Sequence, residues 1–238
     1  MNYIQTIQTE PLKERYEKSD LLIPKYLITE SGKINIYYAP FEFINIDASI
    51  IIVGITPGWT QMEKSFRTII HNLHKGNDWN TAIKEGKKEA SFAGSMRKNL
   101  IAMLDELELN KKLKIESTSE LFTTHSSIVH STSVLKYPVF INGENYTGKN
   151  PTPIGNSSLW SFVKNNFVPE INSFRNKLII PLGVTVSEVL KKLMAENLIN
   201  SNVLLEDFPH PSGANGHRKK LFEDNKAKMK AQIIEWLL

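Results

Sequence analysis

The segment Phe208-Pro209-His210-Pro211-Ser212 has the residue types of a positioned catalytic side chain. Prolines on both sides restrict the backbone around the imidazole of His210 and hold the ring in place. A fixed imidazole can donate a hydrogen bond to an atom on which negative charge develops. Because a single loop histidine is more often solvated or structural than catalytic, the rest of the sequence has to support this interpretation.

A second loop, Gly54-Ile55-Thr56-Pro57-Gly58, directly follows the most apolar run of the sequence. Ligands of open α/β sheets gather at the carboxyl ends of the strands, where a Gly/Pro turn can present backbone amides and one polar side chain. Thr56 is that side chain. No lysine follows Gly58 until Lys64, which excludes a nucleoside-triphosphatase phosphate loop. An ordinary turn is the alternative interpretation.

Alternating strand and helix patterns surround these loops. Residues 48–54 form a continuous β-branched run, typical of a strand buried on both faces. Further strands are predicted at 128–134, 177–181 and 203–206, and helices at 65–75, 79–88, 95–107, 184–197 and 217–238. This order predicts an α/β fold, a three-layer αβα sandwich with a central, mainly parallel four-stranded sheet. We expect residues 1–238 to form a single domain with a lysine-rich insertion at 61–88.

The composition excludes several kinds of chemistry. The 238 residues include no cysteine, so disulfides, thiolate zinc sites, iron–sulfur clusters and a cysteine nucleophile are absent. No apolar run reaches the length of a membrane span, and the first residues do not resemble a secretory signal. The sequence therefore predicts a cytoplasmic soluble protein with no membrane association.

Positive charge is concentrated after the histidine loop. Residues 217–230 hold six Lys/Arg against two acidic residues, a local charge of +4 that equals the net charge of the whole chain. Such a run is usually the solvated face of a helix. At the start of a helix that follows a candidate catalytic loop, it would also favour phosphate binding.

Together the two loops resemble the paired motifs of the uracil-DNA glycosylase superfamily. Gly-x-x-Pro-Gly follows the first strand of the predicted sheet, and His-Pro-Ser-Gly-Ala-Asn follows the last. The sequence is most similar to the single-strand-selective monofunctional uracil glycosylases, on the segments SFAGSMR at 91–97, VHSTSV at 129–134 and NPTP at 150–153. The resemblance covers about residues 50–220 and leaves 61–88 outside.

This resemblance implies a monomeric, monofunctional DNA glycosylase that flips a nucleotide out of single- or double-stranded DNA and hydrolyses its base–sugar bond without metal or cofactor. His210 would donate to the oxygen of the leaving base, and its loss would cost about 10²- to 10³-fold in rate. Phe92 would stack on the base. The implied base-binding residues are Gly54, Ile55, Pro57, Gly58, Phe92 and Ser133. The implied DNA-binding residues are Ser212, Gly213, Ala214, Asn215, His217 and Arg218.

Two positions depart from the superfamily pattern. Thr56 stands where most relatives carry Asp or Asn, and its hydroxyl can orient water but cannot act as a general base. General-base help is then either missing or supplied by another group, for which Asp207 and Glu63 are the candidates. Ser133, or Ser131 if the alignment gap moves, replaces the asparagine that reads the edge of uracil, and it leaves more room. These changes suggest a bulkier base, such as a glucosylated hydroxymethylcytosine of phage DNA removed in antiviral defence.

Three alternatives stay open. The first is excision of uracil or a damaged base in DNA repair. The second is a non-catalytic DNA-binding module, which would bind DNA without producing abasic sites. The third is a small-molecule hydrolase with Ser212 or His210 as nucleophile, disfavoured because the chain has no Gly-x-Ser-x-Gly elbow.

Overall fold

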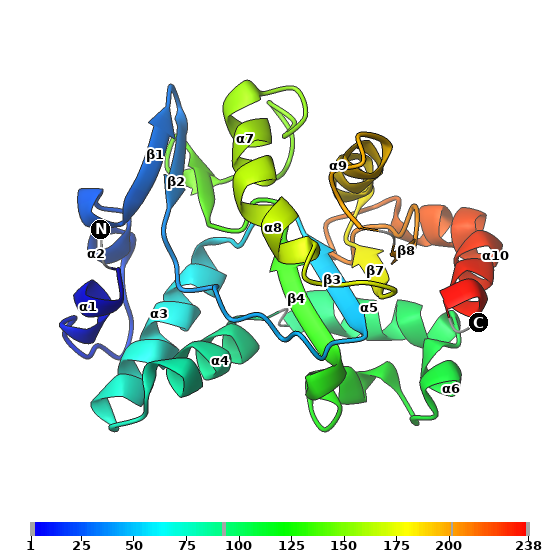
Figure 1. Cartoon of the computed structure of the whole chain (residues 1–238), viewed down its shortest axis with the longest axis horizontal. Coiled ribbons are helices and arrows are strands. Elements are labelled where there is room, and N and C mark those ends of the chain that lie inside the picture. Colours follow the sequence, from blue (N-terminus) through cyan, green and yellow to red (C-terminus); the bar gives the residue numbers. More distant parts are fainter. Residues whose placement is uncertain (1–2, 92–93, 201, 237–238) are drawn as a thin grey trace. The chain divides into compact units, whose positions relative to one another are not determined.

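The computed structural model describes residues 3–91, 94–200 and 202–236 (Figure 1). The chain forms two compact units. Unit 1 comprises Met1–Phe43, Thr56–Ser91 and Leu135–Thr147, and unit 2 comprises Ile44–Ile55, Phe92–Val134 and Gly148–Leu238. The backbone therefore passes from one unit to the other five times. The expectation of a single domain over residues 1–238 stays a prediction.

Unit 2 contains a parallel sheet with strand order β4-β3-β7-β8. The strands are β3 (Ile50–Gly54), β4 (Val129–Ser133), β7 (Leu178–Pro181) and β8 (Val203–Leu204). All four lie within ranges predicted from the sequence, so the α/β class and the four-stranded parallel sheet are confirmed. Because all four strands run in one direction, their carboxyl ends share one edge of the sheet.

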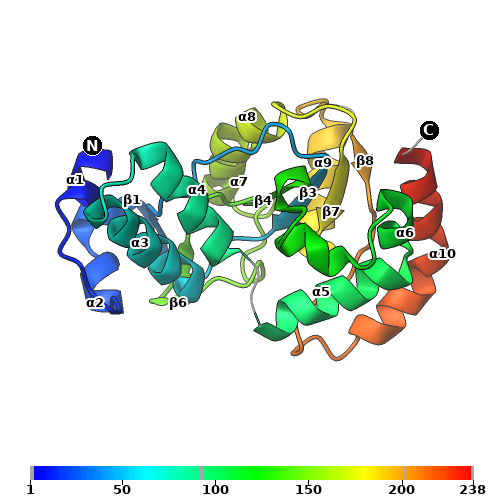
Figure 2. The ribbon, with the colours of Figure 1, turned by 90° about the horizontal axis from the view of Figure 1, so that it is seen from below.

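Helices pack on the sheet of unit 2. Alternate residues of β3, Ile50 and Ile52, share one apolar cluster with α5 (Gly94–Glu106), α6 (Leu109–Leu113) and α10 (Arg218–Trp236). Figures 1 and 2 show these three helices on one side of β3 and β7 and α9 (Val184–Ala195) on the other. The chain also forms α7 (Ser157–Phe162), a π-helical turn at Val163–Phe167 and α8 (Val168–Ile171). Helices α5, α9 and α10 match predicted ranges within a few residues.

Unit 1 has an antiparallel sheet that the sequence analysis did not predict. Its order is β1-β2-β5-β6, formed by β1 (Leu27–Ser31), β2 (Ile34–Tyr37), β5 (Val139–Ile141) and β6 (Glu144–Asn145). Asn142 and Gly143 both have positive φ, 51° and 78°, as a tight turn between β5 and β6 requires. The described part of the chain thus forms two sheets, where the sequence predicted one.

Two long helices carry much of the core of unit 1. These are α3 (Trp59–His74) and α4 (Trp79–Ala90), which extend the predicted 65–75 and 79–88 helices. They cross closely at Gly86, where a Cβ atom would lie 2.5 Å from Cγ1 of Ile69. Apolar residues of both helices are fully buried beside Tyr26. The segment at 61–88, expected as an insertion, therefore contributes directly to the core of unit 1.

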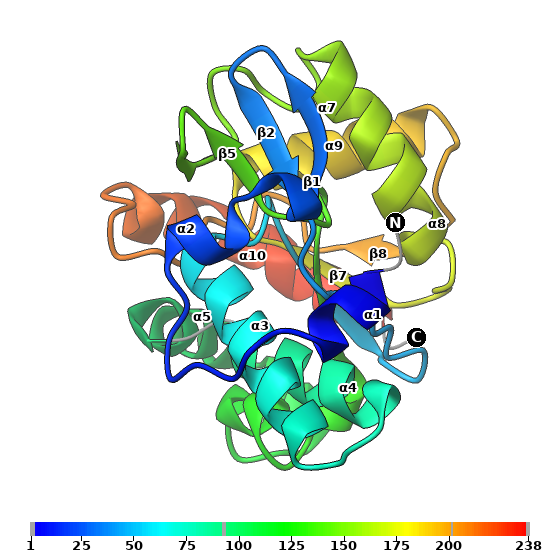
Figure 3. The ribbon, with the colours of Figure 1, turned by 90° about the vertical axis from the view of Figure 1, so that its left-hand side faces the viewer.

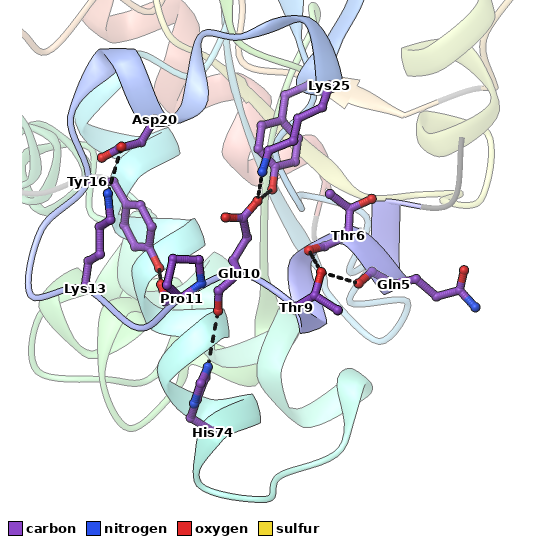
Figure 4. A network of polar contacts seen from close by, with 11 residues as sticks. Gln5, Thr6, Thr9, Glu10, Pro11, Lys13, Tyr16, Asp20, Lys25 and His74 are labelled. Atoms are coloured by element: carbon purple, nitrogen blue, oxygen red, sulfur yellow. Dashed lines mark hydrogen bonds and ion pairs between the residues drawn. The ribbon is translucent and has the colours of Figure 1, made fainter.

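The N-terminal segment is fastened to unit 1 by polar contacts. Helices α1 (Tyr3–Gln8) and α2 (Lys18–Leu21) lie near α3 in Figure 3. Glu10 accepts hydrogen bonds from Lys25 and from the hydroxyl of Tyr26, the latter at 2.6 Å (Figure 4). The hydroxyl of Tyr16 donates to the carbonyl of Pro11 at 2.6 Å, and burial raises its pKa to about 12. These bonds link residues of the chain before β1 to one another, and the amide of Tyr16 donates to Oε1 of Glu63 on α3 at 3.3 Å.

Candidate active site

Several of the predicted residues meet at the carboxyl edge of the parallel sheet. Gly54 ends β3 and is paired with Ser133, which ends β4. A Cβ atom on Gly54 would lie 3.3 Å from the hydroxyl oxygen of Ser133. Glycine at this position therefore avoids a close contact with the hydroxyl. Ile55 packs against Gly148, where a Cβ atom would lie 3.0 Å from Cγ1 of Ile55. Ser131, the alternative to Ser133, lies two residues earlier on the same face of β4.

His210 lies in the loop after β8, at the same edge of the sheet. Phe208 is fully buried, and its carbonyl accepts a hydrogen bond from the amide of Gly183 at 3.1 Å. Gly183 follows β7 with φ of +100°, and a Cβ atom there would lie 3.1 Å from Cβ of His210. Both the conformation and the close approach favour glycine at this position. The histidine is thus fitted against the turn that begins α9.

The hydrogen bonding of His210 defines which ring nitrogen carries the proton. The amide N–H of Ser212 donates to Nδ1 of His210 at 3.2 Å, so Nδ1 accepts. In the neutral ring the proton therefore sits on Nε2. Burial lowers the pKa of His210, which favours this neutral form at pH 7. The ring presents Nε2–H as a hydrogen-bond donor.

Three predicted DNA contacts hold the histidine loop together. The hydroxyl of Ser212 accepts from the amide of Ala214 at 3.2 Å. The side-chain amide of Asn215 donates to the carbonyl of His210 at 3.2 Å. Nη1 of Arg218 donates to the carbonyl of Ser212 at 2.7 Å. In this structure these side chains shape the loop, and their contact with DNA remains a prediction.

The tip of the same loop is exposed. Gly213, Ala214, Gly216 and His217 are solvent-exposed, and a Cβ atom on either glycine would meet no neighbour. Asn99 on α5, which the sequence did not single out, supports the base of the loop by donating to the carbonyl of Pro211 at 2.8 Å. No local pattern could have revealed this contact, since 112 residues separate the two partners.

The remaining loop residues, Thr56, Pro57 and Gly58, belong to unit 1. The hydroxyl of Thr56 donates to the carbonyl of Tyr137 at 2.9 Å and accepts from the amide of Val139 at 3.1 Å. These bonds fasten the loop to the start of β5. Pro57 is buried, and the amide of Gly58 donates to Oε1 of Gln61 at 3.1 Å. The Thr56 hydroxyl therefore has a clear structural task besides the expected orientation of water.

The two carboxylates considered as water-activating groups are both ion-paired. Oε1 of Glu63 accepts from Nε of Arg67 at 2.8 Å. Asp207 contacts Nζ of Lys228 at 2.9 Å and of Lys191 at 3.1 Å. The hydrogen bond from Lys228 contributes most to holding the pKa of Asp207 below its ordinary value. A lowered pKa is the opposite of what would tune Asp207 as a general base to neutral pH.

A third carboxylate, Glu42 of unit 1, was missed by the sequence analysis. It accepts from the hydroxyl of Tyr137 at 2.9 Å, and burial raises its pKa. Tyr137 thus binds Glu42 through its hydroxyl and Thr56 through its carbonyl. Only the folded chain brings Glu42 to Tyr137, because 95 residues separate them. Phe92, predicted to stack on the base, lies outside the described residues.

The described residues were also compared with the requirements of a metal site and of a membrane-spanning helix. Across residues 3–91, 94–200 and 202–236, no group of three or more His, Asp or Glu side chains could hold a metal ion. Among the helices of this same part of the chain, none has the length and apolar character needed to cross a membrane.

The sequence matches no family model. It is 41% identical to the uncharacterized protein YoxB of Bacillus subtilis (strain 168) over 218 residues, which cover 91% of this chain and 85% of YoxB. The chain belongs to the YoxB family. Because the match covers most of both units, we expect the YoxB family to share both sheets and the arrangement of its strands.

In this member of the YoxB family, the carboxyl edge of the parallel sheet offers a defined set of groups. It has a neutral imidazole donor at His210, a serine hydroxyl at Ser133 and an exposed glycine-containing loop tip beside the basic start of α10. These groups can donate to a developing anion and approach a phosphate backbone closely.

Proposed function

We propose that this chain is a monofunctional DNA glycosylase that hydrolyses the bond between a flipped-out base and its sugar. The observation that supports this most is the fixed, neutral imidazole of His210 with its proton on Nε2. As the glycosidic bond breaks, the base leaves with negative charge, and a donor aimed at its oxygen stabilises that charge. Water supplies the new oxygen on the sugar, and an abasic site remains.

The fold is consistent with this function. In unit 2, helices on the two sides of a parallel sheet fit the three-layer αβα sandwich that was expected for the whole chain (Figure 2). The proposed partner is DNA, which the exposed loop tip and the basic start of α10 would contact. The resemblance to the uracil-DNA glycosylases favours a monomer that needs no metal or cofactor, and the composition of the sequence favours the cytoplasm.

The proposed substrate is a modified pyrimidine, such as a glucosylated hydroxymethylcytosine of phage DNA. Ser133 and Gly54 are small residues side by side at the ends of β4 and β3, and they leave more space than an asparagine at Ser133 would. Excision of such a base would damage phage DNA and spare a host that lacks it. Excision of uracil or a damaged base in repair is the alternative substrate assignment.

A non-catalytic DNA-binding module is the second candidate, and a specific observation favours it. Thr56, Asp207 and Glu63 were the candidates for handling water, and each is engaged in a structural bond or ion pair. A protein that kept the DNA surface and lost water activation would show this pattern. It would bind DNA tightly and release no base.

Base release from a panel of DNA substrates separates these functions. Wild-type protein, His210→Ala and the control His125→Ala, which removes an exposed histidine paired with Glu120, are incubated with uracil-containing, damaged and glucosylated phage DNA. Free base and abasic sites are measured by mass spectrometry, and binding is measured separately by fluorescence anisotropy. We expect release from glucosylated DNA, lowered about 10²- to 10³-fold in His210→Ala and unchanged in His125→Ala.

Each other outcome has its own meaning. Efficient release of uracil alone would reject the modified-base assignment and favour repair. Binding to every DNA without release from any would favour the non-catalytic module. Covalent trapping of the protein on DNA by borohydride would contradict a monofunctional mechanism, because it reports a lysine Schiff base.

A further inference from the structure

Four charged side chains meet immediately before the histidine loop. Lys228 of α10 contacts Glu206 at 2.6 Å and Asp207 at 2.9 Å. Lys191 of α9 contacts Asp207 at 3.1 Å and Glu206 at 3.4 Å. Each lysine therefore bridges both carboxylates. We call these four residues the Asp207 clamp; it connects the chain after β8 to two helices.

The backbone at Asp207 makes this clamp relevant to His210. Asp207 has φ of +62°, a left-handed conformation that is unusual for a residue other than glycine. The turn it forms sends Phe208 into the core, where it is fully buried. Pro209 then fixes the next φ, so little freedom remains between Asp207 and His210. The direction of the imidazole consequently depends on the turn at Asp207.

We propose that Asp207 is a positioning residue for His210, acting through its ion pairs with Lys191 and Lys228. The clamp side chains are 33% to 46% exposed, and single ion pairs with such exposure contribute little to stability. Because this network of four charges holds the left-handed turn at Asp207, its main effect is on the direction in which the chain enters the histidine loop. Its effect is expected on the placement of His210 rather than on global unfolding. The effect on rate rests on the proposed glycosylase function.

The test compares Asp207→Asn with Glu196→Gln. Glu196 follows α9 at its far end from Gly183, is ion-paired with Lys192 at 2.6 Å, and is 38% exposed against 37% for Asp207. Asparagine tolerates the left-handed conformation, so Asp207→Asn removes the charge without adding steric strain at this φ. The readouts are kcat and KM for base release and the pKa of His210 followed by NMR.

We expect Asp207→Asn to lower kcat about 10- to 100-fold with KM nearly unchanged, because a misplaced catalytic group slows chemistry more than binding. The pKa of His210 should rise toward its ordinary value as the loop opens to water. Glu196→Gln should change neither quantity. The double variant Lys191→Met/Lys228→Met should reproduce the loss, and adding Asp207→Asn to it should cost nothing more.

The proposal is overturned if Asp207→Asn leaves both kcat and the pKa of His210 at their wild-type values, or if the losses from the two sides of the clamp simply add. If Asp207→Asn does not fold, Lys191→Met against its neighbour control Lys192→Met decides the question by the same readouts. If the wild-type protein releases no base, the proposed function fails, while the NMR titration of His210 still decides whether the clamp positions the ring.

Discussion

Replacing Thr56 with valine removes a hydroxyl while keeping the shape of the side chain. In the structure this hydroxyl donates to the carbonyl of Tyr137 at 2.9 Å and accepts from the amide of Val139 at 3.1 Å. Val139 is fully buried, so its N–H would be left without water or partner. An unsatisfied buried donor costs about 1 to 3 kcal/mol and a lost hydrogen bond about 1 kcal/mol, which together give about 2 to 4 kcal/mol of destabilisation.

Urea unfolding measures this destabilisation for the whole protein, and amide hydrogen exchange measures it locally at Val139. Thr56→Val should lower the free energy of unfolding by that amount and speed exchange at the amide of Val139. Thr56→Ser and Thr56→Asn should stay close to wild type, because both side chains can donate and accept. Thr56→Asp should be destabilised at pH 7, since a carboxylate cannot donate to the carbonyl of Tyr137. Its deficit should shrink at acid pH, where the protonated carboxyl can donate.

The reasoning is refuted if Thr56→Val unfolds within 0.5 kcal/mol of wild type, a typical limit for a neutral surface change. A large loss of base release in Thr56→Val without any change in unfolding or exchange would point instead to a purely catalytic hydroxyl. A Thr56→Ser variant that keeps base release and a Thr56→Asn variant that loses it would also indicate a catalytic role for the hydroxyl.

Three further predictions concern the carboxyl edge of the sheet. Gly183→Ala places a Cβ atom 3.1 Å from Cβ of His210 at φ of +100°, so we expect a loss of about 1 to 3 kcal/mol in thermal unfolding and slower base release; wild-type values for both would contradict the close fit. Because burial lowers the pKa of His210 in the folded chain, His210 of the unfolded chain takes up its proton at a higher pH as the solution is acidified. The contribution of the neutral ring to the free energy of unfolding is therefore complete above pH 6.5 and falls as the pH drops from 6.5 toward the pKa of the folded state. Glutamine does not titrate, so His210→Gln should flatten the plot of unfolding free energy against pH below pH 6.5. An unchanged plot would argue against a buried, neutral His210. Ser133→Asn should improve release of uracil relative to glucosylated cytosine in competition assays, and an unchanged ratio would remove Ser133 from the specificity site.

The sequence predicted the parallel sheet because its strands are apolar and β-branched. β3 consists of three isoleucines, a valine and a glycine, and every residue before Gly54 is fully buried. The antiparallel sheet of unit 1 was missed because its strands are short or polar, and β6 contains only Glu144 and Asn145. The Asn142-Gly143 pair after the apolar β5 is a hairpin signal that could have revealed one of its turns.

The candidate site was predictable where local sequence restricts the backbone. The prolines beside His210 and its position after β8 indicated a fixed imidazole, and the structure places it against Gly183. The sequence could not predict which hydrogen-bond partner each polar side chain has in the folded protein. Asn215 and Arg218 were predicted to bind DNA, but in the structure both donate to carbonyls of the histidine loop. Contacts such as these depend on where the chain returns, which short motifs do not encode.

Because the backbone passes between the units five times, the protein cannot easily be divided into fragments that fold separately. Each unit is assembled from three separate stretches of the chain, so no single cut releases either one intact. Removing the first 43 residues, for example, would deprive unit 1 of β1 and β2 and leave the edge of β5 exposed. Gene fusion or recombination at one point could likewise not transfer one unit to another protein. Point substitutions in the full chain are therefore the appropriate means of dissecting this protein.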